Sequence, residues 1–152
     1  MTPSRLRARI VAERLHWIHE MIRRVAELPL GTYESFRSDP RNAAAAESYV
    51  RRALEALMDL GRHILAKGFG HGPTEYKGIP LGLAQRGVLT EDEADLMMRL
   101  AGYRNRMAHF YNEISEQELY TICTLHIDDI KLASNALRRW IQDHPEKIDR
   151  SL

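Results

Sequence analysis

Residues that could carry out chemistry gather between Gly102 and Tyr111. Metal-free RNA cleavage, in which a 2′-hydroxyl attacks the adjacent phosphate, needs a group that exchanges a proton near neutral pH. It also needs a cation facing the charge that develops on the phosphorane. His109 and Arg104 are residues of these two types, because histidine titrates near neutral pH and a guanidinium matches phosphate oxygens. We predict His109 as the acid or base and Arg104 as the stabilising cation. Asn105 and Tyr111 are predicted to support them by positioning the phosphate or a base.

The helical spacing of these residues leaves their geometry open. At about 100° per residue, Arg104 and Tyr111 share a face, whereas His109 lies roughly 140° from Arg104. Three arrangements could bring the histidine and arginine together. The long arginine wraps around the helix, the helix loosens near His109, or a partner subunit supplies the missing group. The third arrangement would make dimerisation obligatory for activity.

The stretch Arg104–Tyr111 resembles the R-x4-H-x-Y signature of HepT-like toxins of the HEPN class. The Arg-Asn pair at its start and its position before the last long helix are also similar to that family. So are the segments Ala53–Ile64 and Leu83–Leu89. One departure is Arg106, a second cation where many relatives carry an apolar residue.

The resemblance implies a metal-independent endoribonuclease without a cofactor, the toxin of a type II or VII-like toxin–antitoxin pair. Arg104 and His109 would cleave messenger or transfer RNA, and a homodimer would bring the motifs of two subunits together. The implied partner is an MntA-like nucleotidyltransferase antitoxin, which would neutralise the toxin by AMPylation of Tyr111.

Two other interpretations remain open. The chain could be a non-catalytic HEPN substrate-binding module that partners a minimal nucleotidyltransferase. It could also be a purely structural bundle, because an arginine and a histidine near the end of a helix stabilise the negative pole of its dipole. The first alternative predicts partner binding without cleavage. The second predicts that alanine is tolerated at Arg104 and His109.

Helices must position these residues, because apolar side chains recur at three- and four-residue spacing along most of the chain. Asp39-Pro40 predicts a helix start, with Asp39 as the cap. The pairs Thr90/Glu93 and Ser115/Glu118 predict capping boxes. We predict an all-α fold, an antiparallel bundle of four to five helices in a single HEPN-like domain over residues 1–152, and no strand of useful length. The predicted helices lie within residues 6–28, 40–67, 75–87, from 90 onward, and 115–140.

Composition excludes several classes of protein. Lys and Arg total 22 against 21 for Asp and Glu, so RNA contact requires a local patch, such as the arginine-rich first helix. The lone Cys123 fits a reducing compartment, and no segment has the apolar length of a membrane span. We expect a cytoplasmic protein that is not bound to a membrane.

Other histidines receive weaker assignments. Glu13 and His16 have the E-x-x-H spacing of di-iron bundles but lack the second copy that such sites need, so no metal is predicted. His63 follows Asp59 by four residues, and a salt bridge at the edge of the core is favoured over a catalytic role. His126 lies in an apolar stripe and is predicted to be a core residue without a functional role.

Overall fold

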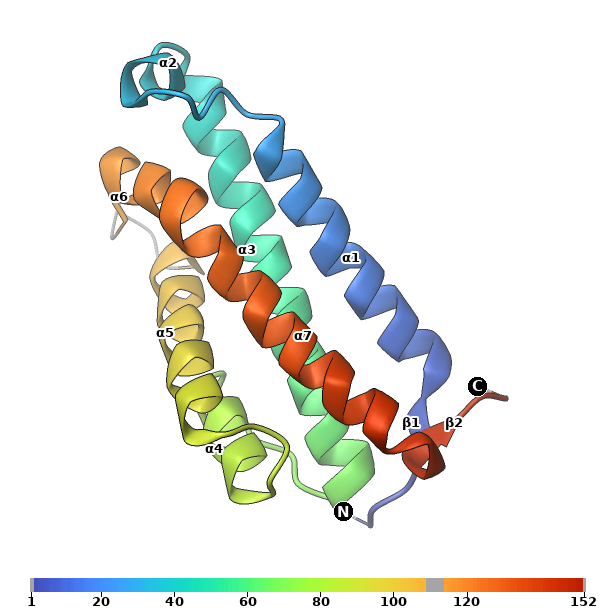
Figure 1. Ribbon diagram of the computed structural model, residues 1–152. Coiled ribbons are helices and arrows are strands. Elements are labelled where there is room, and N and C mark those ends of the chain that lie inside the picture. Colours follow the sequence, from blue (N-terminus) through green and yellow to red (C-terminus); the bar gives the residue numbers. More distant parts are fainter. Residues whose placement is uncertain (1, 109–113, 152) are drawn as a thin grey trace.

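Four long helices form an antiparallel bundle in the computed structural model, which describes residues 2–108 and 114–151 (Figure 1). They are α1 (Ala8–Ala26), α3 (Pro40–His63), α5 (Glu91–Ala108) and α7 (Ile127–Asp143). Shorter helices are α2 (Tyr33–Arg37), α4 (Gly78–Gln85) and α6 (Glu116–Thr121). The π-helical turns η1 (Ile64–Gly68) and η2 (Ile122–His126) and the 3-10 turn η3 (Pro145–Lys147) complete the helical elements described. The all-α bundle is therefore confirmed.

Helix α3 lies at the centre of the bundle, where it contacts α1, α4, α5, α6 and α7. Its apolar stripe is fully buried, for example at Leu54, Leu57 and Leu60. The predicted start is confirmed, since the Asp39 carboxylate accepts a hydrogen bond from the Arg41 N–H at 2.9 Å and Pro40 opens the helix. Because α3 is central, polar side chains at its edge lie close to residues of the neighbouring helices.

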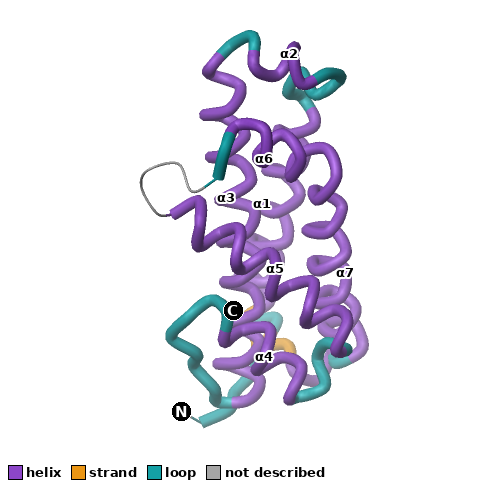
Figure 2. Tube along the Cα trace, turned by 90° about the vertical axis from the view of Figure 1, so that its left-hand side faces the viewer, coloured by secondary structure: helices purple, strands orange, loops and turns teal. Residues whose placement is uncertain are grey.

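The start of α5 is fixed by the predicted capping box. The backbone N–H of Thr90 donates to Glu93 Oε1 at 2.9 Å, and the N–H of Glu93 donates to Thr90 Oγ1 at 3.2 Å. At α6 half of the predicted box is formed, with the Glu118 N–H donating to Ser115 Oγ at 3.1 Å. The Glu118 carboxylate instead binds Arg106. Helix α4 packs against the N-terminal part of α5, and α6 lies near its other end (Figure 2).

Helix α2 and the two short strands were not predicted. Helix α2 lies in a segment expected to be a loop and buries Phe36 completely. Residues Leu6–Arg7, predicted as the start of the first helix, instead form strand β1, which pairs in parallel with β2 (Ile148–Asp149). The strands join the two ends of the described chain at one end of the bundle (Figure 1).

His63 supports this strand pair from the end of α3. Its Nε2 accepts a hydrogen bond from the backbone N–H of Arg7 at 3.0 Å, so the predicted salt bridge with Asp59 is wrong. Burial lowers the pKa of His63 to about 4, and the charges of Lys67, Arg7 and Arg14 act in the same direction. His63 is therefore neutral at neutral pH, as an acceptor nitrogen must be.

This histidine should make stability depend on pH. Its pKa is about 4 in the folded protein against 6.5 in the unfolded chain, so the unfolded chain binds more protons between these values. The free energy of unfolding should therefore fall as the pH drops from about 6.5 to about 4. Urea titrations across this range should show a smaller fall in His63→Gln, whereas His16→Gln, at an exposed position, should follow the wild type. Equal falls in His63→Gln and wild type would contradict this assignment.

Candidate functional site

The predicted site begins in the last turns of α5, which ends at Ala108. Arg104 and Asn105 lie on this helix and are both partly buried. His109 and Tyr111 lie outside the described residues. The described part of the site consists of Arg104, Asn105 and the side chains around Arg104.

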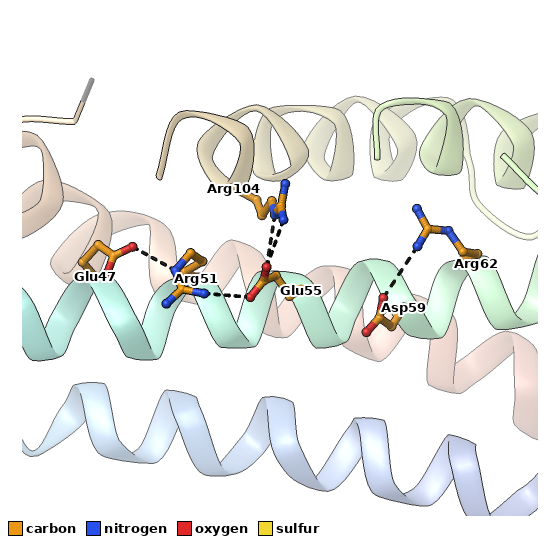
Figure 3. A network of polar contacts seen from close by, with 6 residues as sticks. All are labelled: Glu47, Arg51, Glu55, Asp59, Arg62 and Arg104. Atoms are coloured by element: carbon orange, nitrogen blue, oxygen red, sulfur yellow. Dashed lines mark hydrogen bonds and ion pairs between the residues drawn. The ribbon is translucent and has the colours of Figure 1, made fainter. Parts of the chain in front are cut away.

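Arg104 is held by an acidic side chain from the central helix. Its Nη2 and Nε donate hydrogen bonds to Glu55 Oε2 at 3.0 and 3.3 Å (Figure 3). The side chains of Arg104 and Glu55 are 22% and 28% exposed, so the pair is shielded but remains open to a ligand. Of the five N–H donors of a guanidinium, three are not used by Glu55 and are the groups that a phosphate could engage.

An aromatic ring fixes Arg104 from a second direction. The guanidinium carbon lies 4.2 Å from the ring centroid of Tyr76, in the segment before α4, which is within the range of a cation–π contact. The same ring has the guanidinium carbon of Arg62 at 5.1 Å. Glu55 and Tyr76 were not predicted as site residues, because both lie far from Arg104 in the sequence and form no local pattern with it. Glu55 does lie within Ala53–Ile64, the segment that resembles HepT-like sequences.

The pair of Arg104 and Glu55 belongs to a chain of ion pairs along one edge of α3. Glu55 Oε1 accepts from Arg51 Nη1 at 3.0 Å, and Arg51 Nε donates to Glu47 at 3.0 Å (Figure 3). One turn further on, Asp59 lies 3.9 Å from both Arg14 and Arg62. Burial raises the pKa of Asp59, and the charges of Arg14 and Arg62 oppose this shift. In this set four guanidinium groups meet three carboxylates, which leaves a local excess of positive charge.

Arg106, the second arginine of this stretch, connects α5 to α6. Its Nη1 and Nη2 donate to the two carboxylate oxygens of Glu118 at 2.8 and 2.6 Å. The hydrogen bond with Arg106 holds the pKa of Glu118 below its usual value. This bidentate pair joins the helices on either side of residues 109–113 and so gives Arg106 a structural role.

His126 differs from its predicted place in the core. Its side chain is 37% exposed, and its Nδ1 lies 3.1 Å from Asp129 Oδ2. The ring also lies 5.9 Å from that of Tyr103, measured between centroids. It lies in η2, where the wider π-helical turn interrupts the predicted helix.

Metal and membrane features give no further site in the described chain. Among residues 2–108 and 114–151, no three His, Cys, Asp or Glu side chains gather as they would around a metal ion. Glu13, part of the E-x-x-H spacing, pairs with Arg9 at 3.2 Å. Cys123 is buried, and burial raises the pKa of its thiol to about 12. Within the same residues, no helix combines the length and apolar content that a membrane span requires.

The sequence matches the family described as ribonuclease HepT-like over residues 18–137. A protein of Archaeoglobus fulgidus named as a candidate RNase is 29% identical over 136 residues, which cover 86% of this chain and 96% of that protein.

Solved structures show a similar fold. A chain from a toxin–antitoxin crystal structure with AMP-PNP has a TM-score of 0.76 at 20% identity, over 86% of this chain and 98% of its own. A chain from a complex of tri-AMPylated Shewanella oneidensis HEPN toxin with MNT antitoxin has a TM-score of 0.76 at 21% identity, over 86% of this chain and 97% of its own. At these identities the likeness establishes a common fold.

Proposed function

Because the chain belongs to the ribonuclease HepT-like family, we propose that it is a metal-independent endoribonuclease and the toxin of a toxin–antitoxin pair. The observation that carries this proposal is the arrangement of Arg104, whose guanidinium is oriented by Glu55 and Tyr76 while donors remain for a phosphate. A preorganised cation of this kind stabilises charge that develops in a transition state.

The proposed reaction is an internal transesterification of RNA. The 2′-oxygen forms a bond to phosphorus and the bond from phosphorus to the 5′-oxygen breaks, which leaves a 2′,3′-cyclic phosphate and a 5′-hydroxyl. His109 accepts the proton of the 2′-hydroxyl or donates one to the leaving 5′-oxygen. Arg104 binds the phosphate oxygens on which negative charge increases, and Asn105 helps to position the phosphate. No metal or cofactor enters this scheme.

A homodimer and an antitoxin complete the proposal. The geometry of an ideal helix separates Arg104 from His109, so we propose that a second subunit brings the two motifs together. The proposed antitoxin is an MntA-like nucleotidyltransferase that transfers AMP to Tyr111. The similarity to the fold of the tri-AMPylated Shewanella oneidensis toxin supports this regulation. An adenylyl group on Tyr111 would add bulk and a negative charge to the same sequence motif as the phosphate-binding arginine.

The test is cleavage of RNA in the presence of EDTA. Purified wild-type protein, unmodified at Tyr111, is incubated with total RNA and with transfer RNA, and the new ends are mapped. Wild-type protein should produce 2′,3′-cyclic phosphate ends, whereas His109→Ala should lose at least about a hundredfold in rate.

Circular dichroism must show that both proteins are folded. Absence of cleavage by folded wild-type protein would favour the non-catalytic module that binds a nucleotidyltransferase. Undiminished cleavage by His109→Ala would remove that residue from the mechanism.

A further inference from the structure

A polar hollow lies between α1 and α3, beside the ion pair of Arg104. Its volume is about 250 Å³, and it is open to solvent. Its walls come from six residues of the two helices: Arg14, Trp17, Arg52, Glu55, Ala56 and Asp59. Glu55 is the shared wall, because its carboxylate also binds Arg104 at 3.0 Å. Only the side chain of Glu55 would therefore separate a ligand in the hollow from Arg104 of the proposed cleavage site.

Trp17 is the unusual residue of this hollow. It is 39% exposed, whereas the neighbouring apolar residues Ile18 and Met21 are 1% and 0% exposed. The indole thus presents part of its surface to solvent in a hollow that Arg14 and Arg52 also line. Single-stranded nucleic acids are bound by this combination, in which bases stack on aromatic rings and cations contact the phosphates.

The two carboxylates of the hollow do not leave it negatively charged overall. Glu55 is paired with Arg51 and Arg104, and Asp59 lies near Arg14 and Arg62. The lining itself holds two arginines and two carboxylates. With the residues that pair with these carboxylates, the surroundings contain five arginines (Arg14, Arg51, Arg52, Arg62 and Arg104) and three carboxylates (Glu47, Glu55 and Asp59). This charge balance favours a phosphate-bearing ligand over an apolar or basic segment of a protein.

A second aromatic and arginine pair continues the same seam. Arg24 lies seven residues beyond Trp17, on the same face of α1, and its guanidinium carbon is 5.9 Å from the ring centroid of Tyr49 in α3. Aromatic and cationic side chains thus recur along the seam between α1 and α3. An extended single strand of nucleic acid could follow this seam away from the hollow.

We propose that this hollow is a nucleotide subsite, in which one base of a single-stranded RNA stacks on Trp17 and its flanking phosphates bind Arg14 and Arg52. The proposal rests on the proposed ribonuclease function, because it places the subsite next to the phosphate bound by Arg104. The subsite holds a nucleotide near the bond to be cut and selects unpaired RNA over a duplex.

Binding of an RNA that cannot be cleaved tests the subsite separately from catalysis. The full-length protein is titrated with a fluorescent single-stranded oligonucleotide in which every 2′-hydroxyl is methylated. Trp17→Leu, which keeps an apolar side chain but removes the stacking surface, should weaken binding roughly tenfold. Trp17→Phe, which keeps an aromatic ring, should stay within about threefold of the wild type.

Salt dependence tests the phosphate contacts. Arg52→Ala should weaken binding and reduce the slope of log affinity against log salt by about one, as expected when one phosphate contact is lost. The matched control is Arg138→Ala, because Arg138 lines a different groove, between α1 and α7. It should leave both quantities unchanged.

The outcomes separate the two proposals. If wild-type protein fails to cleave RNA but binds the methylated strand in a Trp17-dependent way, the subsite stands and the ribonuclease assignment fails. If wild-type protein cleaves RNA and Trp17→Leu binds as tightly as wild type, the subsite is wrong. The size of the assembly in solution is measured by sedimentation velocity. If Trp17→Leu forms a smaller assembly than wild-type protein, the indole packs against a second copy of the chain and the subsite proposal is wrong.

Discussion

Arg104→Ala is expected to lower the rate of RNA cleavage by about a hundredfold to a thousandfold, the usual effect of removing a preorganised charge from a transition state. Glu55 and Tyr76 hold the guanidinium in one orientation, so little rearrangement is needed when the phosphate gains charge. Arg104→Lys keeps the charge but loses the planar fork, and most of the rate should be lost in this variant too. Single-turnover cleavage of one RNA by each variant measures these effects.

One control and one variant of the neighbouring carboxylate make this result specific. Arg99→Ala removes an exposed arginine from the same helix and should leave the rate unchanged within about twofold. Glu55→Gln keeps a hydrogen-bond acceptor but removes the charge that orients Arg104, and an intermediate loss of rate is expected. Circular dichroism should show unaltered helix content in all variants. Full activity of a folded Arg104→Ala protein would exclude this arginine from the reaction.

Phe36→Ala is expected to lower the free energy of unfolding by about 3 to 5 kcal/mol. The ring is fully buried, and its centroid lies 5.4 Å from that of Tyr120, which in turn is 5.4 Å from Tyr33. Removal of the Phe36 ring leaves a cavity between α2 and α6. It also removes the aromatic contact with Tyr120. Urea denaturation of the variant measures the loss.

The matched control for Phe36→Ala is Leu132→Ala. Leu132 is also a large apolar residue in a helix but is 58% exposed, so this change should alter the free energy of unfolding by less than about 0.5 kcal/mol. A loss below about 1 kcal/mol for Phe36→Ala would mean that α2 contributes little to the core.

The contrast between α3 and α2 shows which parts of the fold are predictable. Helix α3 has a long apolar stripe and a capped start, and both signals lie within the helix itself. Helix α2 spans only Tyr33–Arg37, too short for a periodic pattern, and depends on the contact of Phe36 with Tyr120 far along the chain. The strand pair is similarly hidden, because two residues carry no alternation.

The candidate site, like the fold, is predictable only in part. Arg104 could be selected by residue type and spacing, but Glu55 is 49 residues away and is brought to it by the packing of α3 against α5. Arg106 could be recognised as unusual, whereas its partner Glu118 was predicted to complete a cap. Long-range pairing between polar residues leaves no local pattern. The roles of His109 and Tyr111 remain predictions.

The pairing of β1 with β2 has a consequence for synthesis of the protein on the ribosome. Leu6 pairs with Ile148, so the first strand is made long before its partner emerges. Until then the Leu6–Arg7 backbone lacks the strand that it pairs with in the finished fold, although α1, α3 and α5 emerge well before Ile148. Closure of the strand pair should thus follow the synthesis of all four long helices, and the nascent chain carries an open strand edge until Ile148 and Asp149 have emerged.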